Sequence, residues 1–328
     1  MSRRWWTAGF LLACSLLVGE ASVGDKSMWY SNCTRHCRQN FDCPPTFSSF
    51  GWVQGSCFWC RYECMWETVE QFERNYGFVP QFHGKWPFGA IPLPFGLVIQ
   101  EPASVIFSLL NLLTFFLMLR KIKRMTFLPR RTMWMVYSHI GMFTWIGSTV
   151  FHTVDCHYTE LLDYNGAVAL IIIALYVSLV FVYGEEDERS FGRIGRSEWF
   201  LTRVAPFFFV AFYLKHSFDM FNKLDYGWNM KCCISMSLVT SAIYIHRLYR
   251  RKMLHGQLDG ADVLLIRLIL WGALATALEL LDFVPVFWIL DSHALFHLAT
   301  VPIPVWWVDY LQQTYQPILE KRENLKIA

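Results

Sequence analysis

The sequence predicts an all-α membrane protein in which a seven-transmembrane helix bundle follows a small disulfide-rich lumenal domain. Hydrophobic residues make up 54% of the 328 residues and charged residues only 17%, whereas soluble domains are about 25% charged. Apolar segments close to the ~20 residues that cross a bilayer recur after Pro94. Six cysteines cluster before these segments. The net charge of +3 is too small to indicate a nucleic-acid partner.

The first 21 residues have the pattern of a secretory signal peptide. Arg3 and Arg4 precede the apolar segment Trp5–Val18, and the small residue Ala21 follows it. Because this segment is short for a membrane span, we expect cleavage near Ala21, with an uncleaved anchor as the alternative. Behind a signal peptide, residues 22–97 are expected to form a lumenal domain.

The predicted lumenal domain is rich in cysteine, and the pairing of its cysteines stays open. In an oxidising compartment we expect three disulfides. Cys57 and Cys60 could instead be half of a zinc site or a redox pair. A further disulfide, between Cys156 and either Cys232 or Cys233, is a hypothesis based on their predicted position on the same side of the membrane. The six cysteines of the domain are Cys33, Cys37, Cys43, Cys57, Cys60 and Cys64.

Residues 98–311 are predicted to form the transmembrane bundle, and residues 312–328 a tail. Sixteen Lys and Arg residues lie on the tail and the loops that share its side, against two on the opposite loops. Since basic loops stay on the cytosolic side, we expect a cytosolic tail and a lumenal N-terminal domain. Six or eight spans are alternatives, because the fourth is short and the seventh contains two prolines. The seven predicted spans are Ile99–Leu119, Thr132–Phe151, Leu161–Tyr183, Trp199–Leu214, Trp228–His246, Val263–Leu281 and Val286–Leu311.

Polar residues inside three of these spans indicate a functional site, because such residues are costly in a membrane. Ser148 and His152 lie one helical turn apart near the end of the second span, and Asp163 lies near the start of the third. His293 and His297 lie one turn apart near the start of the seventh span. The predicted topology places all of these residues at the lumenal side of the membrane.

The three histidines, His152, His293 and His297, are predicted to bind Zn²⁺. Neutral imidazoles suit this ion, and three protein ligands leave one position for water in a catalytic zinc site. Asp163 could orient the water and accept its proton, and Ser148 could donate a hydrogen bond to the developing oxyanion. This chemistry favours hydrolysis of an ester or amide at the membrane surface. The alternative is that the histidines are ordinary polar residues and that Ser148 bonds its own helix.

Other polar residues near the same end of the bundle could orient these ligands or contact a lipid head group. Asp282 and Asp291 are candidates to orient the histidine pair of the seventh span. Asp155 is expected to be a solvated loop carboxylate. The further candidates on the first and sixth spans are Glu101, Ser104, Ser108, Asn111 and Glu279.

Several motifs carry a resemblance to a known family. The S-x-x-x-H of the second span, the Asp eleven residues after that His, and the H-x-x-x-H of the seventh span resemble the CREST superfamily of seven-span proteins with proposed metal-hydrolase activity. Within it, the chain resembles the post-GPI attachment to proteins factor three family from Cys33 to about Pro304. The stretches that carry this closer resemblance are Tyr62–Trp66, Val79–Phe88, Glu101–Ser104, Asp225–Gly227 and Leu280–His297.

The resemblance implies a GPI-specific phospholipase A2, which removes the unsaturated sn-2 acyl chain from GPI-anchored proteins. It implies zinc ligation by His152, His293 and His297, with Asp163 and Ser148 beside the catalytic water. It also implies residence in the Golgi membrane, with the endoplasmic reticulum as the alternative.

Three other functions stay open. A non-catalytic receptor or folding factor would hold a structural metal and would tolerate replacement of Asp163. A serine hydrolase would use Ser148 as nucleophile with His152 as its base. A lumenal chaperone-like factor would act through residues 22–95 alone.

Overall fold

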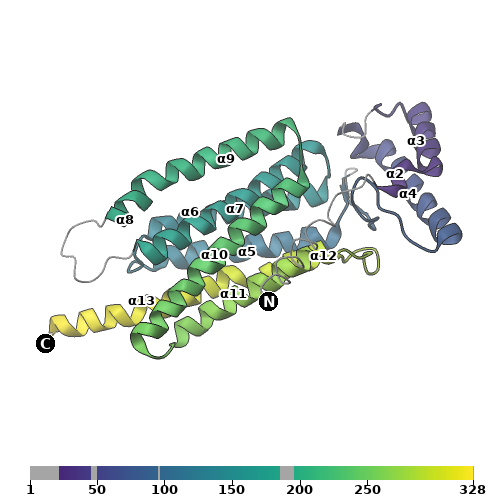
Figure 1. The fold of residues 1–328 in the computed structure, drawn as a ribbon. Coiled ribbons are helices and arrows are strands. Elements are labelled where there is room, and N and C mark those ends of the chain that lie inside the picture. The colour runs from purple at the N-terminus through teal and green to yellow at the C-terminus, as the bar shows by residue number, and fades with distance from the viewer. Residues whose placement is uncertain (1–21, 46–49, 95–96, 185–195, 328) are drawn as a thin grey trace, which may run out of the picture.

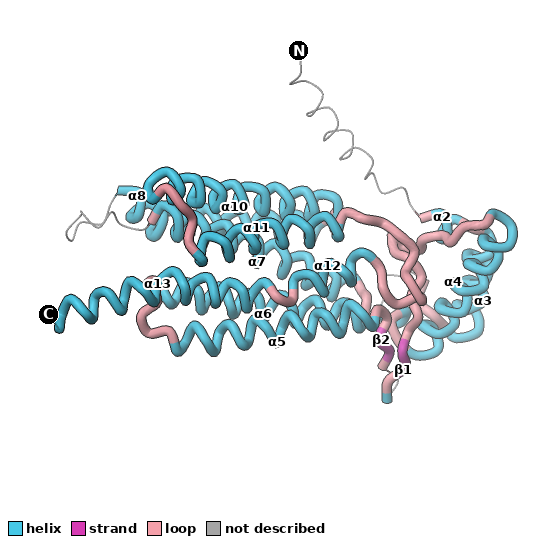
Figure 2. Tube along the Cα trace, turned by 90° about the horizontal axis from the view of Figure 1, so that it is seen from below, coloured by secondary structure: helices cyan, strands magenta, loops and turns pink. Residues whose placement is uncertain are grey.

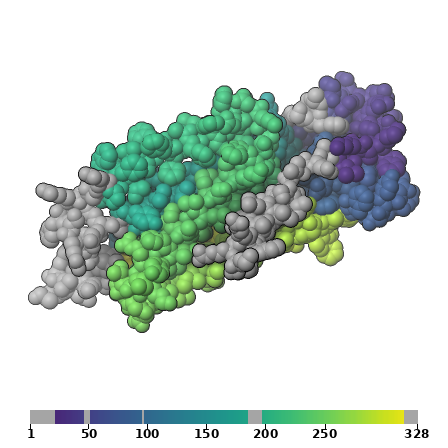
Figure 3. Space-filling view, viewed as in Figure 1, coloured from purple at the N-terminus to yellow at the C-terminus, as the bar shows by residue number. Residues whose placement is uncertain are grey.

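The computed structural model describes residues 22–45, 50–94, 97–184 and 196–327, and these are mostly helical. A small N-terminal domain lies at one end of an elongated helical bundle (Figures 1 and 3). The C-terminus lies at the other end (Figure 1). The predicted all-α membrane fold with an N-terminal disulfide-rich domain is confirmed. The predicted signal peptide, residues 1–21, lies outside the described residues.

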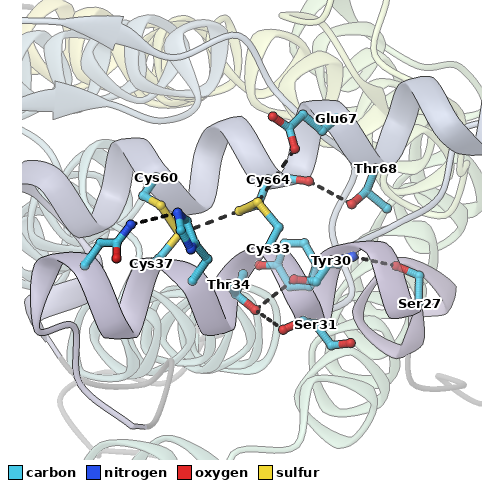
Figure 4. Close-up of a disulfide and its surroundings, with 12 residues drawn as sticks. Ser27, Tyr30, Ser31, Cys33, Thr34, Cys37, Cys60, Cys64, Glu67 and Thr68 are labelled. Carbon is cyan, nitrogen blue, oxygen red and sulfur yellow. Dashed lines mark hydrogen bonds between the residues drawn. A yellow bond between two sulfur atoms is a disulfide. The ribbon is translucent and has the colours of Figure 1, made fainter.

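The N-terminal domain is built on two long helices that run in opposite directions. Three nested disulfides join them: Cys33–Cys64, Cys37–Cys60 and Cys43–Cys57. Figure 4 shows the first two bridges between the facing sides of the helices. The elements of the domain are α2 (Val23–Lys26), α3 (Met28–Phe41), η1 (Phe50–Trp52) and α4 (Gly55–Tyr76).

The disulfide pattern follows from helical spacing. Cys33 and Cys37 are four residues apart, so both lie on one face of α3, and Cys60 and Cys64 share a face of α4 in the same way. Antiparallel packing of these faces gives nested pairs. The zinc and redox alternatives for Cys57 and Cys60 are therefore wrong, because each is bonded to a cysteine outside that pair.

Among the described residues, three cysteines lie outside this domain, and none of them is in a disulfide. Cys156, Cys232 and Cys233 are free thiols. The hypothesis of a disulfide between Cys156 and one of the other two is wrong for the described residues.

A linker, residues 78–94 and 97–101, packs between the N-terminal domain and the bundle. It contains a short antiparallel pair of strands, β1 (Ile91–Pro92) and β2 (Val98–Ile99) (Figure 2). The Trp86 indole donates to Asp282 at 2.5 Å, and the Gly89 amide donates to the Trp288 carbonyl at 2.7 Å. These bonds attach the linker to the loop that precedes the last two helices.

The bundle helices largely follow the predicted spans. The predicted fourth span, Trp199–Leu214, begins at the end of α8 (Arg196–Trp199), includes the π-helical turn η3 (Phe200–Val204) and continues into the next helix. The long bundle helices are α5 (Pro102–Arg124), α6 (Arg131–Thr153), α7 (His157–Tyr183), α9 (Ala205–Asn222), α10 (Tyr226–His255), α11 (Gly260–Glu279) and α13 (Ile303–Ile327), with the short α12 (Ser292–Thr300) before α13.

The prediction was wrong for the start of the seventh span. Residues 286–290 form a tight turn closed by a Val286–Leu290 bridge, with Phe287 and Trp288 in the left-handed region at φ 54° and 60°. The helix starts only at Ser292, and it is interrupted between α12 and α13. Pro302 lies in this interruption, and its lack of an N–H group removes one helical hydrogen bond.

The bundle has the surface of a membrane protein. Among the described helices, α5, α7 and α11 are each long and apolar enough to cross a membrane. Large apolar side chains point outward even from α9, where Phe207 is 75% and Phe208 is 67% exposed. Apolar patches of this kind are rare on soluble monomers. Polar side chains such as Ser108, Asn111 and Ser148 are buried instead.

Close packing of α5, α6, α7 and α12 positions the polar interior. At Gly141 on α6, an added Cβ would lie 2.2 Å from the Phe115 ring of α5, so only glycine permits this approach. A large apolar core, which includes Trp134, Met118 and Leu265, fills the part of the bundle beyond the polar residues.

Candidate metal centre

His152 lies in the last turn of α6 with its side chain 1% exposed. Its Nδ1 is 2.6 Å from Oε2 of Glu101, the residue that precedes α5. Its Nε2 is buried, and no hydrogen-bond partner for it exists among the described residues. A buried polar nitrogen without a partner is costly, and a metal ion would satisfy it.

His293 and His297 lie one turn apart on α12, which begins after the N-cap residue Asp291. Nδ1 of His293 is 2.7 Å from Oε2 of Glu279, at the end of α11. Nδ1 of His297 is 3.1 Å from Oγ of Ser108 on α5. As in His152, the Nδ1 atom of each ring has a hydrogen-bond partner. Such outer partners commonly fix the tautomer of metal-binding histidines.

The three imidazoles converge. One ring nitrogen of each lies within 4.8 Å of the others. The ring centroids are 5.2 Å apart for His152 and His293, 5.0 Å for His152 and His297, and 4.4 Å for His293 and His297. Tetrahedral zinc ligands at ~2.0 Å from the ion would lie roughly 3.4 Å apart, which small side-chain rotations would achieve. The three imidazoles and the unpaired Nε2 of His152 therefore fit Zn²⁺.

The three histidines differ in their exposure to solvent. His152 and His297 are buried, whereas the His293 side chain is 31% exposed. An open side at His293 is what a site that exchanges substrate requires, because a closed structural zinc site has four protein ligands.

Ser148 and Asp163 lie beside the histidines, as the sequence predicts. Oγ of Ser148 is 3.0 Å from Oγ of Ser108, which connects Ser148 to the His297 ring. Asp163 interacts electrostatically with both His152 and His293. The structure thus brings together all five residues singled out from the sequence, while their chemical roles stay predictions.

A short hydrogen-bond chain links His297 to Ser148 through Ser108. If Nδ1 of His297 carries the ring proton, it donates to the Ser108 hydroxyl, which can then donate to Ser148. In the part of the chain that the structure describes, no hydrogen bond joins Ser148 to His152, which the serine-hydrolase alternative requires.

Lys85, which the sequence analysis missed, connects the linker to this site. Its Nζ lies 2.9 Å from Oε1 of Glu101 and 2.7 Å from Oδ2 of Asp155, and it lies 4.1 Å above the Phe151 ring. Burial alone would lower the pKa of Lys85, but the two carboxylates outweigh it and raise the pKa above its usual value. Asp155 is therefore ion-paired and not merely solvated. The lysine lies in the predicted Val79–Phe88 motif, which was the available signal.

Some of the residues expected to orient the histidines do contact their rings. Glu101, Glu279 and Ser108 each contact a histidine ring. Asp291 caps α12 by accepting from the Ala294 amide at 2.8 Å, and Asp282 bonds the linker, so neither forms a hydrogen bond with a histidine ring in the described residues.

A cavity of about 310 Å³ adjoins the metal centre. It lies between α4, the linker and the first turn of α7, and Lys85 and Glu101 are part of its wall. Glu101 therefore contacts the cavity and holds His152 at the same time.

Comparison with known proteins gives a consistent picture. A profile described as the Per1-like family matches residues 47–315. The chain is 35% identical to "GPI-specific phospholipase A2-like PGAP3" of Danio rerio, over 90% of this chain and 92% of the relative. It is 33% identical to "Post-GPI attachment to proteins factor 3" of Drosophila melanogaster, over 92% of each chain, and 29% identical to the Homo sapiens PGAP3, over 96% of each. No solved structure shows significant similarity.

Proposed function

Because the chain belongs to the Per1-like family, we propose that it remodels GPI anchors by hydrolysing the sn-2 acyl ester, as a zinc-dependent GPI-specific phospholipase A2. The names of its relatives support the substrate. The observation that carries the proposed chemistry is the convergence of three imidazoles in a polar interior, with Asp163 and Ser148 beside them.

Each of these residues has a proposed role. His152, His293 and His297 would hold Zn²⁺, with the unpaired Nε2 of His152 as one ligand atom. Zinc at this position supplies Lewis acidity, which polarises an ester carbonyl and makes water more acidic. The Asp163 carboxylate accepts a proton from the attacking water. The Ser148 hydroxyl donates to the oxygen on which charge develops. Glu101, Glu279 and Ser108 keep the three rings oriented.

The arrangement of the chain also supports a lumenal site. The histidines lie in the last turn of α6 and on α12. Figure 2 shows α12 toward the end of the bundle that carries the disulfide-linked domain. Arg124, Arg130 and Arg251 lie at helix ends away from that domain. By the positive-inside rule, we propose a lumenal N-terminal domain for residues 22–97, a membrane bundle for residues 98–311 and a cytosolic tail. Golgi residence, with the endoplasmic reticulum as the alternative, belongs to the same proposal.

Ester release from a purified GPI-anchored protein tests this function. The full-length chain in detergent should release one fatty acid, and mass spectrometry should locate the loss at sn-2. Chelation should stop the reaction, and added Zn²⁺ should restore it. His152→Ala should be inactive, whereas His139→Ala, an exposed histidine on the same helix, should match the wild type. Turnover that persists in His152→Ala would refute the proposal.

A further inference from the structure

The cavity beside the metal centre has a wall of mixed chemistry. Aromatic rings of Phe58, Tyr62 and Trp86 line one part of it, and ionisable groups line the rest. Tyr62 is fixed in place, because its ring stacks on Phe58 at 5.8 Å and its hydroxyl accepts from the Ala90 amide at 3.1 Å. Preformed pockets with aromatic walls and a few placed polar groups are typical of ligand sites.

The charges around the cavity leave one cation without a carboxylate. Lys85 is paired with Glu101 and Asp155, and Glu160 accepts a hydrogen bond from the Tyr164 hydroxyl at 2.9 Å. Arg61 of α4 also lines the cavity and is partly buried. Within the described residues, no ion pair or hydrogen bond involves its guanidinium. A planar guanidinium with free donors suits a phosphate group.

The cavity lies where the head group of a lipid substrate would be. If acyl chains enter from the apolar sides of the bundle, the polar part of the lipid must face the N-terminal domain. The sn-2 ester and the phosphate of a glycerophospholipid are separated by only a few bonds. In the protein, the metal centre and the cavity are also close together, since Glu101 contacts His152 and lines the cavity.

We infer that this cavity binds the phosphoinositol-glycan head group of the substrate, with Arg61 on the phosphate and the Tyr62 and Trp86 rings against the sugars. This inference rests on the proposed function, and it assigns substrate selection to the contact between the N-terminal domain and the bundle. Amphipathic aromatic rings offer apolar faces to the carbon–hydrogen side of a sugar. Paired carboxylates at the wall can still accept hydrogen bonds from sugar hydroxyls, because each oxygen has more than one acceptor site.

Binding of two soluble probes to the full-length protein in detergent tests the inference by calorimetry. The first probe is a glycerophosphoinositol glycan prepared by alkaline deacylation of a GPI anchor, and the second is glycerophosphoinositol without sugars. The glycan should bind more tightly. Arg61→Gln should weaken binding of the glycan at least about tenfold, because it removes a charge-assisted hydrogen bond. Arg61→Lys keeps the charge and should weaken binding less. Arg74→Gln, an exposed arginine on the same helix, should bind like the wild type.

The outcomes separate the head-group site from the hydrolase activity, because neither probe contains an acyl ester. Arg61-dependent glycan binding without any hydrolysis would support the head-group site and refute the phospholipase. Equal affinity for the two probes would overturn the glycan assignment. Unchanged binding in an Arg61→Gln protein that melts like the wild type would overturn the site itself, even if hydrolysis is observed.

Discussion

The Glu101 carboxylate lies 2.6 Å from Nδ1 of His152, and its other oxygen lies 2.9 Å from Nζ of Lys85. One residue before the first bundle helix thus connects a candidate zinc ligand to the linker from the disulfide-rich domain. The position of the ligand on α6 consequently depends on how that domain is attached to the bundle.

Glu101→Gln should weaken zinc binding without removing a ligand. The amide can still accept a hydrogen bond from Nδ1 of His152, but it lacks the charge that makes the imidazole a stronger ligand. Loss of such an outer partner typically costs about 10- to 100-fold in metal affinity. Competition with a chromophoric chelator measures this effect, and Glu63→Gln, exposed on α4, is the control. Equal affinity in wild type and Glu101→Gln would contradict the proposed role.

Lys85→Met should destabilise the protein by roughly 2 kcal/mol, because the variant leaves two carboxylates without their cation. Lys85→Arg should lose less. The raised pKa of Lys85 keeps it protonated in the folded protein well above neutral pH. A lysine whose pKa is raised by folding stabilises the folded protein fully at any pH below its pKa in the unfolded chain, ~10.4. This stabilisation is lost only as the pH rises through the pKa of the lysine in the folded protein.

The difference between wild type and Lys85→Met should therefore stay constant between about pH 6 and pH 9. Thermal unfolding in detergent at several pH values measures it. A stability difference that disappears toward pH 9 would show that the lysine loses its charge in this range, contrary to the ion pairs seen in the structure.

Asp163→Asn and Ser148→Ala should separate catalysis from metal binding. Asp163→Asn removes the proton acceptor and should lower turnover by about 10²–10⁴. Ser148→Ala removes one donor to the oxyanion and should cost about 10²–10³. Both variants should keep their zinc. A receptor or folding factor with a structural metal predicts instead that Asp163→Asn behaves as the wild type. A serine hydrolase predicts covalent labelling of Ser148 by a fluorophosphonate.

Hydropathy and the placement of polar residues were enough to predict the helical bundle and the histidine cluster. Polar and ionisable residues are rare in membrane segments unless they have a function. This rarity is what singled out Ser148, His152, Asp163, His293 and His297. Helix direction then placed them at one depth, and the structure brings them together.

Contacts that depend on tertiary packing were harder to predict. Nothing in the sequence pairs Lys85 with Asp155, because only the packing of the linker on the end of α6 brings them together. The start of the last membrane segment was misplaced because Val286–Leu290 is apolar, and hydropathy does not detect a turn with left-handed residues at Phe287 and Trp288. The nested disulfides follow from the cysteine spacing only once α3 and α4 are known to be antiparallel helices, and the sequence alone left that packing open.

Zinc content of the purified full-length protein tests the central claim most directly. Elemental analysis should find close to one zinc per chain in the wild type and in His139→Ala. His152→Ala, His293→Ala and His297→Ala should each lose the ion while keeping the disulfides of the N-terminal domain. Absence of a bound metal from the folded wild type, or full zinc occupancy in any of the three variants, would contradict a site made by imidazoles from α6 and α12.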